Sequence, residues 1–125
     1  MYLPDTNIFI QAFKGSKKEK SFLEKAVKEN QLYISPIVIA EFLAGPRETE
    51  KAKEKFYFLV NMFEVLPVDK EVARIAAGYR KESLKTKRVH LLDCFLAAQT
   101  KLKDLVLVTN NKSDFPMKDI KILAP

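Results

Sequence analysis

Three acidic side chains lie in apolar stretches of this 125-residue chain, where ionised groups are uncommon. Asp5 follows the apolar start of the chain, Glu41 lies within residues 37–44, and Asp93 lies within residues 91–96. None of these stretches contains a Lys or Arg that could form an ion pair. Because a partly buried carboxylate without a partner costs several kcal/mol, one shared divalent cation would offset the cost for all three.

A fourth acid, Asp114, lies in the loop after residues 105–108, which form a continuous apolar run typical of a buried parallel strand. Asp5 also follows a predicted strand, and Glu41 and Asp93 are expected on the first turns of neighbouring helices. In an open parallel sheet, ligands bind beyond the carboxyl ends of the strands, so all four acids could reach one point. The alternative interpretation makes Asp5 a helix cap and Asp114 a turn residue.

The composition limits which metal such a site could bind. The chain has one Cys and one His, which excludes a Cys/His zinc site. Clustered carboxylates repel one another unless a cation lies among them, and oxygen ligands favour Mg²⁺ or Mn²⁺. Because such ions activate water and stabilise the leaving oxygen in phosphodiester cleavage, the predicted reaction is metal-dependent hydrolysis of a nucleic-acid backbone.

The net charge also favours a nucleic-acid partner. The chain carries 22 basic against 16 acidic residues, for a formal charge of +6. Such a surface attracts polyanions, although Lys/Glu-rich surfaces are also typical of heat-adapted proteins and of ordinary solvated helices. The candidates for phosphate contacts are the basic residues Arg80, Lys81, Lys85, Lys87, Arg88 and Lys112.

The remaining chemistry-bearing residues have structural explanations. Cys94 lies in an apolar helical pattern and is expected in the core, and His90 is expected at the surface or as a cap. Asp69 is predicted to cap a helix, and Glu19 is one of several Glu residues predicted on solvated helix faces. No stretch approaches the roughly 20 apolar residues of a membrane span, and no secretion signal is found, so a cytoplasmic protein is expected.

The hydrophobic pattern predicts one α/β domain over residues 1–125, with a mostly parallel sheet of four to five strands flanked by helices. The predicted strands cover residues 1–4, 32–34, 63–68, 105–108 and 120–123. The predicted helices cover residues 8–13, 17–30, 37–44, 47–62, 70–88 and 91–102, with Ser16 and Ser35 as caps of the second and third.

Four short motifs give the chain a resemblance to PIN-domain ribonucleases, and among them to the VapC-type toxins of toxin–antitoxin pairs. The motifs occur in the family's order and spacing and span the chain from end to end. They read Tyr2-Leu-Pro-Asp-Thr-Asn-Ile8, Ser35-Pro-Ile-Val-Ile-Ala-Glu-Phe42, Asp93-Cys-Phe-Leu-Ala-Ala98 and Val108-Thr-Asn-Asn-Lys-Ser-Asp-Phe115. With Met1 directly before the first motif, no preceding targeting or RNA-binding segment is expected.

The resemblance implies a PIN fold and divalent-metal-dependent endoribonuclease activity, with Asp5, Glu41, Asp93 and Asp114 as the acidic metal site. It also implies that Asn7 orients Asp5, that Thr109 and Asn111 are supporting polar groups, and that the protein forms a homodimer. A cognate antitoxin would inhibit it by covering the acidic groove with its tail. One departure is Asn110, where many relatives have a basic residue.

Two other functions fit parts of this pattern. A receiver-like signalling domain is also a small parallel α/β fold with acids at strand ends, but Thr6 and Asn7 follow Asp5 where a second acid would be needed. A PIN scaffold that binds RNA or protein without catalysis would be expected to lack at least one of the four acids. All four are present, which favours the enzyme.

Overall fold

All five strands of the protein are parallel to their neighbours, in a computed structural model that describes residues 1–46 and 48–125. The strands β1 (Tyr2–Pro4), β4 (Val106–Val108) and β5 (Lys121–Leu123) form a sheet in the order β1-β4-β5. The strands β2 (Tyr33–Ile34) and β3 (Glu64–Val65) form a separate pair. The prediction of one sheet of four to five strands is therefore wrong in its connectivity, although the parallel α/β class is confirmed.

Proline explains why the two sheets do not merge. A single parallel bridge joins Tyr2 of β1 to Leu32, and the Tyr2 amide donates to the Gln31 carbonyl at 2.8 Å. The next amide of β1 on that edge would belong to residue 4, which is Pro4 and has no N–H to donate. The ladder between β1 and the β2–β3 pair therefore ends after one bridge.

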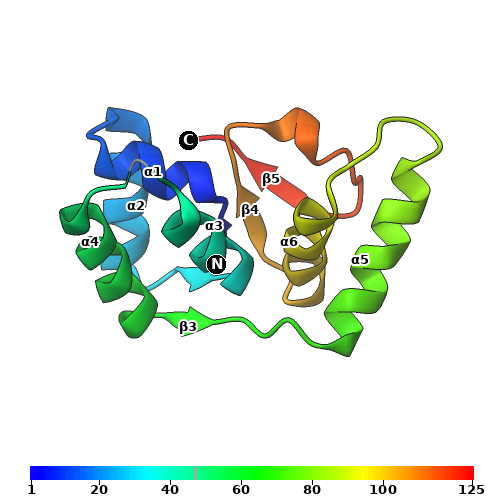
Figure 1. Ribbon diagram of the computed structural model, residues 1–125, viewed down its shortest axis with the longest axis horizontal. Helices are drawn as coiled ribbons and strands as arrows, with labels where there is room; N and C mark the ends of the chain where they lie inside the picture. The colour runs from blue at the N-terminus through cyan, green and yellow to red at the C-terminus, as the bar shows by residue number, and fades with distance from the viewer. Residues whose placement is uncertain (47) are drawn as a thin grey trace.

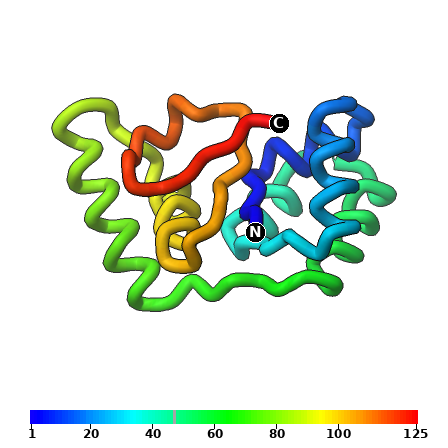
Figure 2. The backbone as a smooth tube through the Cα atoms, turned by 180° about the vertical axis from the view of Figure 1, so that it is seen from behind, coloured from blue at the N-terminus to red at the C-terminus, as the bar shows by residue number. Residues whose placement is uncertain are grey.

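Helices cover the sheet on both sides, as Figure 1 shows, with α1, α2 and α4 on one side and α5 and α6 on the other. In the view from behind in Figure 2, the segment from β3 to α5 runs along one edge and connects the two groups. The helices are α1 (Thr6–Phe13), α2 (Lys17–Lys28), α3 (Pro36–Ala44), α4 (Glu50–Met62), α5 (Lys70–Ser83) and α6 (Leu91–Leu102), with a short 3₁₀ helix η1 (Lys112–Asp114).

Most predicted element boundaries move by a few residues. The helix predicted over 47–62 begins at Glu50, and Arg47 lies outside the described residues. The strand predicted over 63–68 is shortened to β3, although the Leu66 amide still donates to the Ile34 carbonyl of β2 at 2.9 Å. Two predicted caps are confirmed: Ser35 accepts from the Ile37 amide at 3.1 Å, and Asp69 accepts from the Val72 amide at 3.0 Å. Ser16 is at the N-cap of α2 but makes no side-chain capping bond.

Aromatic packing fixes the helices that lie next to the acidic residues. The ring of Phe56 from α4 stacks on Phe42 of α3 at 4.2 Å and meets Phe9 of α1 edge-on at 5.2 Å. Such pairs add about 0.5–1.5 kcal/mol each beyond the burial of their area. On the other side, α5 and α6 enclose a smaller cluster that includes Cys94, which is buried as predicted. The packing thus fixes α1 and α3 relative to each other.

Candidate active site

Asp5 lies at the junction of β1 and α1 and is held by hydrogen bonds from two segments. Its backbone amide donates to the Val108 carbonyl of β4 at 2.8 Å. Its Oδ1 accepts from the Thr6 amide at 2.8 Å, and its Oδ2 accepts from the Thr109 hydroxyl at 3.0 Å. With only 9% of its surface exposed, Asp5 therefore combines the position of an N-cap with a fixed orientation toward the loop after β4.

The orientation of Asp5 differs from what the motif implied. Asn7 was expected to orient Asp5, yet its side chain is exposed and makes no hydrogen bond within the described residues. Thr6 and Thr109 hold the carboxylate instead. Asn111 contributes through its backbone, because its amide donates to the Thr109 hydroxyl oxygen at 3.0 Å.

Glu41 is brought to Asp5 by the neighbouring residue of the first motif. The Thr6 hydroxyl donates to Glu41 Oε1 at 2.8 Å, so that α1 and α3 are joined directly beside Asp5. Glu41 lies in the second turn of α3 rather than the first, and it is exposed rather than partly buried. Its apolar sequence neighbours misled the burial prediction, because only Val38 and Phe42 of α3 are buried while Glu41 is exposed.

Asp93 lies in the first turn of α6, as predicted, and is half-buried. Burial, first, and then the negative charges of Asp5, Glu41 and Asp114 together raise the pKa of Asp93 to about 6, against the opposing effect of His90. Burial likewise raises the pKa of Asp5, with contributions from Glu41 and Asp114, although the hydrogen bonds from Thr6 and Thr109 lower it. The four acids thus lie close enough to act on one another electrostatically.

These four acids form the acidic edge, a name used here for Asp5, Glu41, Asp93 and Asp114. Nothing in the described chain neutralises it, since none of the five ion pairs found there involves any of these residues. The donor set is made only of carboxylate oxygens, which suits Mg²⁺ or Mn²⁺. As arranged, no three His, Cys, Asp or Glu side chains of the described residues form a ready metal site. Glu41 and Asp114 are both exposed, so packing does not fix their side chains.

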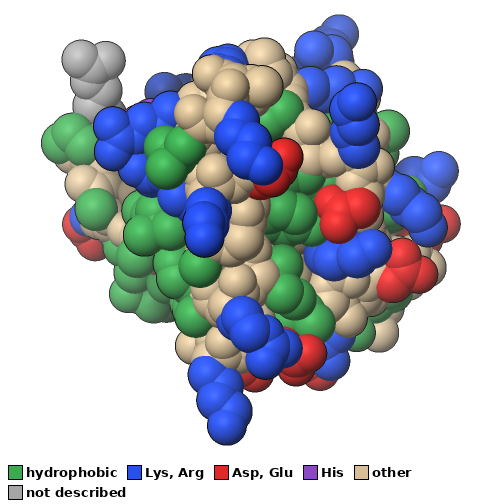
Figure 3. All heavy atoms as spheres, turned by 90° about the vertical axis from the view of Figure 1, so that its right-hand side faces the viewer, with side chains coloured by type: hydrophobic (Ala, Val, Ile, Leu, Met, Phe, Trp, Pro, Cys, Tyr) green, Lys and Arg blue, Asp and Glu red, His purple; other side chains and the backbone are tan. Residues whose placement is uncertain are grey.

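Basic residues lie on the loops next to Asp114. Figure 3 shows Lys and Arg side chains spread over the face that carries α5, with apolar and acidic groups among them. Lys87 donates to the carbonyl of Ser113 at 3.2 Å, which joins the loop between α5 and α6 to η1 and Asp114. Of the predicted phosphate contacts, Arg80 is half-buried and the others are exposed: Lys81, Lys85, Lys87, Arg88 and Lys112. His90 occupies the N-cap position of α6 without a capping bond and is exposed, as expected for a surface His.

Sequence reasoning missed two residues near this edge. Thr6 was treated only as part of a motif, yet it is buried and joins Asp5 to Glu41. Glu19 was predicted on a solvated helix face, and this is wrong because only 3% of its surface is exposed. Its Oε1 accepts from the Asn110 side chain at 3.1 Å. The spacing of Ser16 and Glu19, which is that of a capping box, was the one local signal that Glu19 is not simply solvated.

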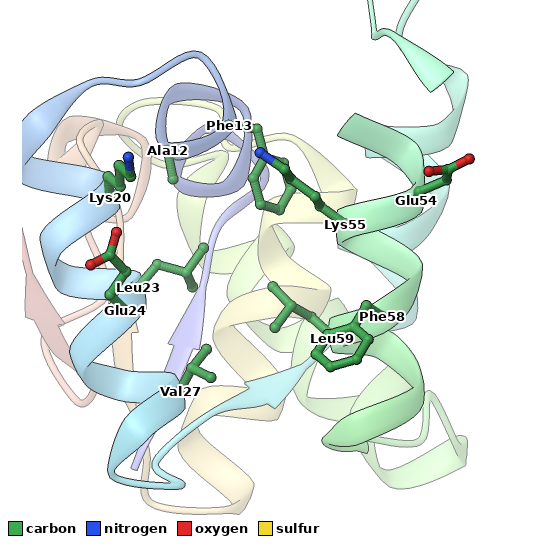
Figure 4. Close-up of a pocket in the computed structure, with 10 residues that line it drawn as sticks. All are labelled: Ala12, Phe13, Lys20, Leu23, Glu24, Val27, Glu54, Lys55, Phe58 and Leu59. Carbon is green, nitrogen blue, oxygen red and sulfur yellow. The ribbon is translucent and has the colours of Figure 1, made fainter. Parts of the chain in front are cut away.

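A second feature, the α2–α4 groove, lies at the other end of α1. It is an open hollow of about 480 Å³ lined mainly by apolar side chains. Figure 4 shows Leu23 and Val27 of α2 facing Leu59 of α4 across it, with Phe13 of α1 closing one end. Phe58 of α4 lines the groove with 64% of its surface exposed, which is unusual for so large an apolar side chain without a partner.

The chain matches the PIN-domain family model over residues 2–121. This match covers nearly the whole sequence. The chain belongs to the PIN-domain family. The family that the resemblance indicated is therefore confirmed.

Curated relatives of this PIN domain include ribonucleases and a toxin. It is 30% identical to Ribonuclease VapC10 of Mycobacterium tuberculosis, in a match that covers 94% of this chain and 87% of the relative. It is 27% identical to Toxin FitB of Neisseria gonorrhoeae, with 100% and 98% of the two chains covered. Among solved structures, DNA-bound VapBC from Salmonella typhimurium matches with a TM-score of 0.81 and 26% identity over 98% of this chain and 96% of that one. No helix in the described part of the PIN domain is long and apolar enough to span a membrane.

Proposed function

We propose that this PIN domain is a divalent-metal-dependent endoribonuclease that acts as the toxin of a toxin–antitoxin pair. The observation that supports the proposal is the acidic edge, in which carboxylates from three other segments act electrostatically on Asp93 and no ion pair of the described chain involves any of the four. Relatives named as ribonucleases support RNA as the substrate. The net charge of +6 supports a polyanionic substrate of the same kind.

Each member of the acidic edge would have a defined part in this reaction. Asp5, Glu41, Asp93 and Asp114 would hold Mg²⁺ or Mn²⁺, which when bound activates water and stabilises negative charge on phosphate oxygens. Thr6 and Thr109 keep Asp5 in one orientation through bonds of 2.8 and 3.0 Å, so that little reorganisation is needed on binding. Lys87 and Lys112, next to Asp114, would contact backbone phosphates and align the RNA strand.

The function is tested with purified protein free of any partner, incubated with a mixed RNA pool. Cleavage should require Mg²⁺ or Mn²⁺, stop on addition of EDTA, and disappear in a folded Asp93→Asn variant. An amide at this position cannot supply the negative charge that a hard cation needs. If the two proteins bind RNA equally and neither cleaves it, the catalytic assignment fails and the RNA- or protein-binding module becomes the better description.

We infer that the α2–α4 groove receives the antitoxin. The groove presents the exposed Phe58 beside the half-buried Phe13 and Val27, and therefore suits the apolar face of a partner segment. The helix α1 connects this groove to Asp5 and has eight residues, which corresponds to roughly 12 Å at about 1.5 Å per residue. A bound segment could thus continue from the groove to the acidic edge and block it.

The proposed homodimer has a separate candidate surface at the start of α6. Leu91 and Leu92 are adjacent large apolar residues, and both are exposed next to Asp93. A second copy that covers them would bring two acidic edges near each other. Sedimentation or light scattering of the isolated protein should give twice the mass of one 14.4 kDa chain, and a Leu92→Lys variant should give the monomer mass.

A further inference from the structure

Glu19 is the third residue of α2, and its carboxylate is enclosed by protein. One oxygen, Oε1, accepts a hydrogen bond from the side-chain amide of Asn110 at 3.1 Å. The other, Oε2, is buried and has no hydrogen-bond partner within the described residues. A carboxylate at the start of a helix is favoured by the helix dipole, but exposure would provide that benefit without the cost of burial. Its burial therefore needs a further explanation.

The partner of Glu19 belongs to the loop that holds Asp5. Asn110 lies between Thr109, whose hydroxyl donates to Asp5 Oδ2 at 3.0 Å, and Asn111, whose amide donates to the Thr109 hydroxyl oxygen at 3.0 Å. The Thr109 amide donates to the Leu123 carbonyl of β5, also at 3.0 Å. Every hydrogen bond that the Thr109 hydroxyl makes thus depends on the backbone of residues 109–111, and Glu19 contacts the middle residue of that segment.

Asn110 has no other restraint on its side chain. It is exposed, so packing does not select its conformation, and its bond to Glu19 is the one side-chain hydrogen bond that it makes among the described residues. The two residues are 91 positions apart in sequence. The bond therefore joins the N-terminal turn of α2 to a loop whose other hydrogen bonds run from Thr109 to Asp5 and to Leu123 of β5.

We propose that Glu19 is a positioning residue for the acidic edge: by holding Asn110 it keeps the backbone of residues 109–111 in place and the Thr109 hydroxyl on Asp5. It touches neither substrate nor metal in this role. The proposal rests on the proposed nuclease function for its effect on catalysis, while its effect on the loop is independent of that function. It also gives Asn110, where the resemblance led us to expect a basic residue, a defined role as a neutral donor.

The test compares four variants in the metal-free protein and in RNA cleavage. Glu19→Ala and Asn110→Ala remove the bond from its two ends, and Glu19→Gln keeps an oxygen that can accept it. Glu29→Ala, at the exposed C-cap of the same helix, is the matched control. Amide hydrogen exchange at Asn111 reports the loop directly, and kcat and KM for an oligonucleotide report the site.

In Glu19→Ala and Asn110→Ala, exchange at Asn111 should accelerate and kcat should fall about fivefold with KM nearly unchanged, since one net hydrogen bond contributes about 1 kcal/mol. The exchange rate at Asn111 and the kcat of the Glu19→Gln and Glu29→Ala variants should stay within about twofold of the parent values. If Glu19→Ala does not fold, Asn110→Ala carries the test, because Asn110 is exposed.

Two results would overturn the proposal. One is a Glu19→Ala or Asn110→Ala variant that only melts at a lower temperature, with exchange at Asn111 and kcat unchanged, because that is the signature of a helix-capping role. The other is an equal loss in Glu19→Gln and Glu19→Ala, which would assign the effect to negative charge instead of the hydrogen bond. If the parent itself cleaves no RNA, the proposed function fails, while the exchange measurement still decides whether Glu19 holds the loop.

Discussion

The two ends of α1 are built in opposite ways. At its start, Asp5 is buried and hydrogen-bonded to residues from the first and last thirds of the chain. At its end, Phe13 closes the α2–α4 groove, where apolar side chains such as Phe58 face solvent. The acidic edge concentrates groups that repel one another, and the groove concentrates groups that water disfavours. On the proposed function, the acidic edge would take a cation and the groove would take a partner.

The largest expected effect is a loss of RNA cleavage, and it comes from a substitution at the start of α1. Asp5→Asn should reduce RNA cleavage about 100-fold or more, which is typical of removing one preorganised charged group from a reaction site. The fold should persist, because the Asn side-chain oxygen can still accept from the Thr6 amide. Binding of the antitoxin, measured by calorimetry, should stay within about threefold of the parent, a change under 1 kcal/mol. A variant that loses binding and cleavage together would show that the two ends are not separable.

The converse variant is Phe58→Asp in the α2–α4 groove. A charge on this exposed position should weaken antitoxin binding by about 10- to 100-fold, the usual cost of losing an aromatic anchor. Cleavage by the isolated protein should not change, because α4 contributes no residue to the acidic edge. Calorimetry with the antitoxin and a cleavage assay without it provide the two measurements. Unchanged binding would place the antitoxin elsewhere and remove the groove from this comparison.

The smallest expected effect is on thermal stability, and it tests the repulsion within the acidic edge. The pKa of Asp93 is about 6 in the folded protein, against 3.8 as its ordinary value. Between these values the carboxyl is ionised in the unfolded chain and protonated in the folded one, so raising the pH favours unfolding. The melting temperature of the metal-free protein should therefore fall as pH rises from about 4 to about 6, with no further loss from Asp93 above that range.

Asp93→Asn supplies the control for this measurement, because an amide does not titrate. It should melt higher than the parent at pH 7 without metal and show a weaker decline across the same pH range. Adding Mg²⁺ to the parent should restore its melting temperature, since a ligand that binds only the folded state stabilises it. If the parent and the variant have identical pH profiles, the surroundings of Asp93 do not raise its pKa in the folded protein.

The sequence by itself determined roughly where the four candidate acids lie. Asp5 and Asp114 follow runs whose β-rich composition marks buried strands, and parallel strands bring their carboxyl ends to one edge. The caps at Ser35 and Asp69 could also be predicted from the sequence, because a capping side chain bonds to amides only two or three residues away. These are local rules, because the residues that each rule concerns lie within a few positions of one another.

Only the tertiary structure decided how those acids are held. The Thr6 hydroxyl meets Glu41 across 35 positions, the Thr109 hydroxyl meets Asp5 across 104, and Glu19 is covered by a loop 91 positions away. No periodicity encodes such contacts, since they depend on where whole elements pack. The division of the sheet at Pro4 is intermediate: the missing amide is visible in the sequence, but its consequence depends on which edge of β1 meets residues 31–33.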